Sequence, residues 1–341
     1  MHTNGHEWKA RRARSSLHHP GTAKGRGMSA CFLRGRDAHS AIASPWGKAD
    51  AARMRRFCLG TAALLLAVVL LSSLLTYPAW LLADAWAPDR WHFQRVFNRV
   101  LMLSTLALLP LLARSWGLGW RDMGLHAPAR RAAAQALAWG LAGAGMIAAL
   151  ALAGMACGFR VPHVEWTPGR ALGHLASGVA VGLAEEAIFR GFFFLAAWKV
   201  LVPRAPVLLA VLGSAVFASV HFFIDVRAAA EVPHWGSGWA LWAELGRLLL
   251  SPEPLLTRWL SLFLAGLVLC ALAARQGHLW GAIALHAGWV FGIKTVHRLT
   301  DSSGGPSLWF SSDLLSGLWA SVLLALLLAG LAWRPVRSPS P

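Results

Sequence analysis

Charged side chains are scarce in this chain. Only 14% of its 341 residues are Asp, Glu, Lys or Arg, whereas an average soluble domain has about a quarter. Apolar residues make up 56% of the sequence, and they gather in blocks of about 18 residues or more, enough for a helix to cross roughly 30 Å of hydrocarbon. Lipid offers the backbone no hydrogen-bond partners, so such blocks must be helical. The composition excludes a single soluble domain and predicts an all-α, polytopic membrane helix bundle.

Three signatures of chemistry or transport are also missing. The four cysteines form no C-x-x-C pair, so they support neither a disulfide framework nor a thiolate metal site. The His-Glu-x-x-His pattern of many zinc proteases does not occur. We find no internal repeat of the kind that marks secondary transporters. A transporter is therefore the least favoured of the functions considered below.

Acidic residues are few: 15 Asp and Glu stand against 32 Lys and Arg, which gives a net charge of +17. In a soluble protein this excess would suggest nucleic acid, but no basic motif with interleaved aromatic residues is present. Much of the excess lies in residues 1–56, and most of the rest lies in short loops between the apolar blocks. Lys and Arg are typical of the cytoplasmic loops of membrane proteins. We therefore expect membrane lipid, and no nucleic acid, among the partners.

The first 53 residues differ in composition from the rest of the chain. They are basic, polar and without sustained apolar periodicity, which predicts a disordered segment. A second interpretation is that this segment is not native. Met54, followed by two arginines and a long apolar run, looks like an ordinary start of a membrane protein. Both interpretations stay open.

The apolar blocks predict about eight transmembrane helices. They lie at residues 58–82, 97–113, 132–156, 171–198, 206–224, 258–275, 279–296 and 314–333. Residues 238–250 are too short to cross a bilayer and carry Glu244 and Arg247, so we expect an amphipathic helix at the membrane surface. The loop charges place both termini in the cytoplasm, although Lys294 and Arg298 run against this trend. The composition favours a bacterial inner (cell) membrane protein.

Ionisable groups inside the apolar blocks are functional candidates, because each costs roughly 3 kcal/mol to insert. Glu185, Glu186 and Arg190 lie in the middle of the fourth block. Glu186 and Arg190 are four residues apart and can pair on one helix face. Glu185 points about 100° away and lacks a partner on its own helix. This division predicts a structural pair and a separate carboxylate that can act as a general base; a purely structural network of all three is the alternative.

Two histidines complete the set of candidates. His221 follows Phe217 by one helical turn in the fifth block, and His286 lies in the seventh block. Taken alone, each would more often be a packing residue. Counted from the expected cytoplasmic helix ends, Glu185 and His221 lie at matching depths, whereas His286 comes out about two turns shallower.

Together these residues resemble a known family. Glu-Glu-x-x-x-Arg, then Phe-x-x-x-His, then a His on a later helix is similar to the CAAX prenyl protease 2 family. Its wider group of membrane endopeptidases is also described as bacteriocin-processing (CPBP) or abortive-infection (Abi) proteases. The resemblance covers about residues 170–295. It implies a CAAX protease-like catalytic core at 169–298. The rest of the chain then divides into the basic segment 1–53, N-terminal transmembrane helices at 54–168, and a last helix and tail at 299–341.

The resemblance also implies roles for the residues. Glu185 with His221 would activate the attacking water, and His286 would steady the oxyanion of the tetrahedral intermediate. Glu186, Arg190 and Phe217 would support them. The sequence departs from the family at Val290, where many relatives carry Asn or Asp one turn after the histidine. The oxyanion donor expected there must then come from a backbone N–H or from another side chain, such as the Trp289 indole.

The family has been described both as metal-dependent and as acting through a glutamate and water. We favour no cofactor, and a zinc ion held by Glu185, His221 and His286 is the alternative that stays open. The resemblance implies an endopeptidase that cleaves a membrane-associated or exported protein or peptide. A catalytically silent scaffold or immunity protein of the same fold is the second hypothesis, which Val290 favours.

Overall fold

The structure is a computed structural model that describes most of the chain between residues 48 and 332. The residues outside the description are 1–47, 89, 127, 129, 164, 166, 201–205, 225, 227–231, 251–255, 304–307 and 333–341. Most of the expected N-terminal segment at 1–53 therefore lies outside the described residues, as does the C-terminal tail. The described residues all lie within a single compact unit.

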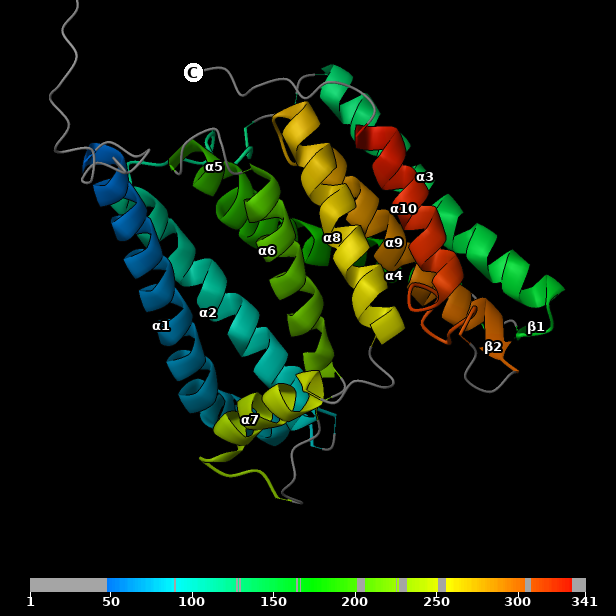
Figure 1. The fold of residues 1–341 in the computed structure, drawn as a ribbon. Coiled ribbons are helices and arrows are strands. Elements are labelled where there is room, and N and C mark those ends of the chain that lie inside the picture. The colour runs from blue at the N-terminus through cyan, green and yellow to red at the C-terminus, as the bar shows by residue number, and fades with distance from the viewer. Residues whose placement is uncertain are drawn as a thin grey trace, which may run out of the picture. The chain divides into compact units, whose positions relative to one another are not determined.

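Helices make up most of the described chain, which confirms the all-α prediction (Figure 1). The longer ones are α1 (Lys48–Trp86), α2 (Phe93–Ser115), α3 (Arg130–Ala156), α4 (Pro168–Glu186), α6 (Pro206–Val220), α7 (Ser237–Leu249), α8 (Leu256–Gln276), α9 (Trp280–Leu299) and α10 (Leu318–Ala332). A π-helical segment η1 (Ala187–Ala196) and the short α5 (Ala197–Val200) continue α4, and a 3-10 turn η2 (His221–Ile224) continues α6.

Each expected transmembrane block falls on one of these helices. Within the described residues, five helices are long and apolar enough to cross a membrane, judged by length and composition: Met54–Trp86, Phe93–Ser115, Arg130–Ala156, Pro206–Phe223 and Leu256–Gln276. The apolar helix α10 is shorter. The chain is therefore an integral membrane protein, and the number of eight crossings stays a prediction.

The segment expected to lie on the membrane surface forms α7. Figure 1 shows α7 running across the ends of the neighbouring helices rather than along them. It packs against α1 and η2, and Leu241 and Leu245 are buried on its inner face. Its exposed face carries Arg247, whose guanidinium pairs with Glu244. An apolar and a charged side on one short helix are typical of the interfacial position that we predict.

The helix α9 lies at the centre of the packing, between α3 and α4. Glycines let these backbones approach closely: a Cβ at Gly178 of α4 would lie 2.7 Å from the Ala287 carbonyl oxygen, and a Cβ at Gly182 would lie 2.9 Å from that of Ile283. On the α3 side, a Cβ at Gly143 would lie 2.5 Å from the Leu285 carbonyl oxygen. Small residues at such contacts are a usual means of packing helices in membranes.

A short antiparallel β-ladder links the outer ends of α3 and α9. Strand β1 (Arg160–Pro162) pairs with β2 (Thr300–Ser302) directly after α9. The buried Arg160 guanidinium donates to the Thr300 hydroxyl at 2.7 Å and to the Ser312 carbonyl oxygen at 3.2 Å. The ladder and this arginine hold the end of α9 in place, and so fix the helix that carries His286.

The close contact between α4 and α9 is testable with matched glycine substitutions. Gly178→Ala should lower the thermal unfolding midpoint in detergent, because its methyl group would meet backbone and such overpacking costs about 1–3 kcal/mol. Gly173→Ala on the same helix is the control, since nothing lies within 4 Å of its Cβ. Equal midpoints for the two variants would contradict the packing described here.

Candidate active site

The two glutamates stand where α4 changes its winding. Glu185 and Glu186 are the last residues of α4, and the chain continues directly into the π-helical segment Ala187–Ala196. Such wider turns occur frequently at functional sites. The side chain of Glu186 is fully buried, whereas that of Glu185 keeps 22% of its surface exposed. Adjacent carboxylates on one helix therefore have different surroundings, as the sequence predicted.

Glu186 joins two helices through one carboxylate oxygen. Its Oε1 accepts a hydrogen bond from Arg190 Nη1 at 2.9 Å and another from His286 Nδ1 at 2.8 Å. The Arg190 side chain is 1% exposed, and its Nη2 also donates to the Gly266 carbonyl oxygen of α8. The pair with Arg190 has the expected spacing. The bond to His286 was not expected from the sequence, because nothing in the spacing of α4 indicates which face of α9 it meets.

Phe217 is the aromatic centre of the site. The Arg190 guanidinium carbon lies 4.2 Å from the centroid of the Phe217 ring, a cation–π distance. The His221 ring lies 4.3 Å from the same centroid and the His286 ring 6.0 Å. Phe217 is buried, so its ring separates the buried ion pair from the imidazole of His221 and holds both in place.

The hydrogen bonds of the two imidazoles assign their protons. His221 Nδ1 donates to the Phe217 carbonyl oxygen at 2.7 Å, since a carbonyl can only accept. His286 Nδ1 donates to the Glu186 carboxylate in the same way. In the neutral rings this leaves both Nε2 atoms without a proton. These two nitrogens lie 3.5 Å and 3.8 Å from Glu185 Oε2.

The structure thus brings Glu185, His221 and His286 together from three helices. Glu185 Oε2 is buried and has no hydrogen-bond partner among the described residues. Its distances to the two Nε2 atoms are longer than a direct hydrogen bond and suit one bridging molecule. A carboxylate that shares one small space with two imidazoles can take up, hold and return a proton.

His286 meets Glu185 although the count from the helix ends predicted a shallower position, because α9 begins inside the protein. Leu279, directly before α9, is fully buried, and its N–H donates to the Gly124 carbonyl oxygen at 3.1 Å. The Trp280 indole donates to the His126 carbonyl oxygen at 2.8 Å. The loop after α2 therefore covers the first turn of α9, so His286, the seventh residue of the helix, already reaches Glu185.

The loop after α2 is itself held by a charged contact between Asp122 and Lys199. Asp122 accepts hydrogen bonds from the Gly119 N–H at 2.8 Å and from Lys199 Nζ at 3.0 Å. The bond from Gly119 is the main reason that the pKa of Asp122 is lowered, and the Lys199 ammonium lowers it further. The loop is thereby tied to the end of the helix that carries the two glutamates.

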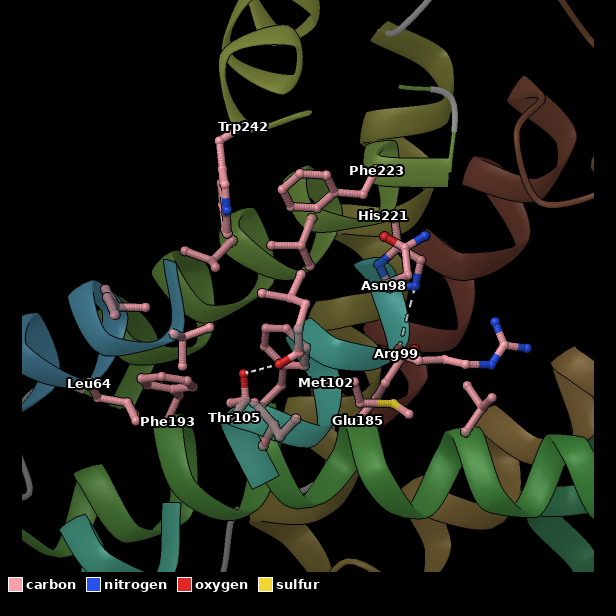
Figure 2. A pocket seen from close by; sticks show the side chains of 18 residues that line it. Leu64, Asn98, Arg99, Met102, Thr105, Glu185, Phe193, His221, Phe223 and Trp242 are labelled. Carbon is pink, nitrogen blue, oxygen red and sulfur yellow. Dashed lines mark hydrogen bonds and ion pairs between the residues drawn. The ribbon is translucent and has the colours of Figure 1, made fainter. Parts of the chain in front are cut away.

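A cavity of about 470 Å³ opens beside the site (Figure 2). Glu185 and His221 line it, and His286 is not among its lining residues. Its walls are mostly apolar and come from α1, α2, α4 with η1, and α6 with η2; Trp242 of α7 also lines it. The polar residues on the α2 wall are Asn98, Arg99 and Thr105. The sequence analysis did not identify the α2 wall of the cavity. The signal that could have indicated it is Asn98, an amide within the apolar block 97–113.

The search for a metal centre gives no group of three or more His, Cys, Asp or Glu side chains arranged to hold an ion among the described residues. His286 Nδ1 and Glu186 Oε1 are bound to each other, which leaves the Glu185 carboxylate and the Nε2 atoms of His221 and His286 as the groups that could bind zinc. Zinc at these three side chains stays an alternative to the mechanism without a cofactor.

Val290 lies one turn after His286 on α9 and offers only an aliphatic side chain at the position where relatives carry a polar one. Trp289, the substitute considered from the sequence, is buried among apolar residues of α3 and α8. Its ring centroid lies 6.4 Å from that of His286, and its Nε1 is buried without a hydrogen-bond partner among the described residues. Val290 itself offers no polar group, and a donor at Trp289 stays a prediction.

A carboxylate that faces two imidazoles inside a helix bundle defines a membrane-embedded site able to activate water. Residues 167–292 match the family model described as Type II CAAX prenyl endopeptidase Rce1-like. The match confirms the resemblance drawn from the motifs, over the segment that it covers. No curated protein and no solved structure matches the chain.

The role of Glu186 as the partner of a buried arginine is testable. Glu186→Gln should lower the free energy of unfolding by about 3–5 kcal/mol, because it leaves the Arg190 charge buried without compensation. Protein yield and the thermal unfolding midpoint in detergent measure this effect. Glu185→Gln is the matched control and should leave both nearly unchanged, since Glu185 keeps contact with the cavity. Equal, mild effects of the two substitutions would refute the division between them.

Proposed function

We propose that the chain is an intramembrane endopeptidase that hydrolyses a peptide bond of a membrane-associated or exported protein or peptide. The proposal rests on one observation: Glu185 Oε2 is buried without a hydrogen-bond partner and lies within 3.8 Å of the Nε2 atoms of both His221 and His286. The match of residues 167–292 to a family of endopeptidases supports the same conclusion.

In the proposed reaction, Glu185 is the general base. It accepts a proton from a water molecule bound between its carboxylate and His221 Nε2, and the water oxygen attacks the carbonyl carbon of the peptide bond. A C–O bond forms, and the carbonyl oxygen takes up the negative charge of the tetrahedral intermediate. When the intermediate collapses, the C–N bond breaks and Glu185 returns its proton to the leaving amine. Protons and charge balance without a further reactant.

The role proposed for His286 is to stabilise the negative charge. The Glu186 carboxylate accepts a hydrogen bond from its Nδ1–H, as a carboxylate does in a serine protease triad. The proposed step uses the doubly protonated ring, whose Nε2–H donates a hydrogen bond to the oxyanion. Arg190 pairs with the same oxygen of Glu186, so the ion pair orients the imidazole.

The cavity suggests the kind of substrate. Its walls are mostly apolar, and Glu185 and His221 stand at its polar end, so an apolar stretch of peptide fits beside the scissile bond. We further propose an inner-membrane location with both termini in the cytoplasm, from the charge of the loops.

A catalytically silent scaffold of the same fold is the second candidate, and Val290 is the observation that favours it. A scaffold needs the buried ion pair for stability but has no use for Glu185. The substitution experiment that follows separates the two functions.

Glu185→Gln should lower cleavage by at least about 10²-fold, because general bases contribute about 10²–10⁴-fold. Cleavage is measured with purified protein in proteoliposomes and a library of apolar fluorogenic peptides, with new peptide ends identified by mass spectrometry. Glu244→Gln is the control, as this carboxylate lies on α7 and pairs with Arg247. Cleavage by the Glu185→Gln variant at the wild-type rate would end the proposal, and a wild-type protein that cleaves nothing would favour the scaffold.

Metal dependence is tested by chelation. We expect cleavage to persist after exhaustive dialysis against EDTA and 1,10-phenanthroline, because the proposed base, nucleophile and oxyanion donor need no metal. Metal analysis of the purified protein is the independent readout. Loss of cleavage that stoichiometric zinc restores would replace this mechanism with one in which the same side chains bind a metal ion.

A further inference from the structure

Asn98 is the one amide side chain on the wall of the cavity that Glu185 and His221 also line. Figure 2 shows the Asn98 and His221 side chains at the same end of that cavity. The Oδ1 of Asn98 is buried and has no hydrogen-bond partner among the described residues. A buried polar atom without a partner costs about 1–3 kcal/mol, so its presence asks for an explanation.

The other polar side chains on this face of α2 have structural partners. Gln94, one turn before Asn98, donates its amide hydrogen to the Phe223 carbonyl oxygen and ties α2 to η2. Thr105 donates its hydroxyl hydrogen to the Leu101 carbonyl oxygen at 2.8 Å. Asn98 lies between them along the helix, and its side-chain carbonyl oxygen has no such partner among the described residues. Packing of α2 therefore does not account for an amide at this position.

The neighbour of Asn98 on the cavity wall, Arg99, lies close enough to Lys294 for the two positive charges to repel each other. Lys294 is two turns after His286 on the same face of α9. This stretch of α2 therefore lies on the side of the site where α9 continues beyond His286.

We propose that Asn98 is a further catalytic residue, whose amide donates the hydrogen bond to the oxyanion that position 290 no longer provides. A half-turn of the amide exchanges Oδ1 for Nδ2 and aims an N–H into the cavity. The inference rests on the proposed peptidase function. It means that α2, which lies outside the matched segment 167–292, contributes a chemical group as well as a wall.

The test is the turnover of three variants in the proteoliposome assay. Loss of an oxyanion donor costs about 10²–10³-fold in kcat, so Asn98→Leu should lose that much while KM changes little. Ser115→Ala removes a hydroxyl from the last turn of the same helix, outside the cavity lining, and serves as the control; it should stay within about threefold of wild type. Where Asn98→Leu fails to accumulate, the isosteric Asn98→Asp takes its place and should lose kcat to a similar extent.

Rescue separates catalysis from packing. Adding Val290→Asn to Asn98→Leu should raise kcat at least tenfold above that of Asn98→Leu alone, because the new amide provides a hydrogen-bond donor from α9. A loss of kcat caused by poor packing would not be reversed by this second substitution. An unchanged kcat in Asn98→Leu, or a loss without rescue, overturns the inference. If the wild-type protein cleaves and Glu185→Gln abolishes cleavage while Asn98→Leu does not lower it, the role of Asn98 is refuted and the peptidase function stands. If the wild-type protein does not cleave, both the peptidase function and the role of Asn98 are refuted.

Discussion

The guanidinium of Arg190 is the group on which the rest of the site depends. It stays charged at any pH that the protein meets, and its burial in an apolar bundle requires a counter-charge. Glu186 provides that charge from the preceding turn, and the same oxygen binds His286. One buried carboxylate thus joins α4 to α9, orients an imidazole and leaves the neighbouring Glu185 without a partner on its own helix. Of the two adjacent glutamates, Glu186 is required by the packing, and Glu185 is the carboxylate proposed to act as the base.

Backbone geometry makes this arrangement possible. Gly178 and Gly182 let α4 approach α9 closely enough for the side chain of Glu186 to reach across. The π-helical turn after Glu186 changes the direction of the following side chains, and Arg190 lies in it beside the ring of Phe217. Larger side chains at the glycines would separate the helices and lengthen the bond to His286. The hydrogen bonds of the polar cluster therefore depend on the small residues that bring α4 and α9 together.

The N-terminal helices belong to the site even though the matched segment begins at residue 167. Residues of α1 and α2 form one wall of the cavity, and Trp242 of α7 adds to its lining. The loop after α2 covers the start of α9 through Gly124 and His126. The size and polarity of the cavity beside Glu185 are consequently set in part by helices outside the matched segment.

The sequence by itself determined the membrane class, the helices and the separate surroundings of Glu185 and Glu186, because hydropathy, block length and the four-residue spacing to Arg190 are properties of single segments. It also named both histidines, through a motif. Only the tertiary structure decided that Glu186 binds His286, that α9 starts below the loop after α2, and that Asn98 lies on the cavity wall. These facts depend on which faces of separate helices meet, and periodicity along one helix carries no information about the face that its neighbour presents.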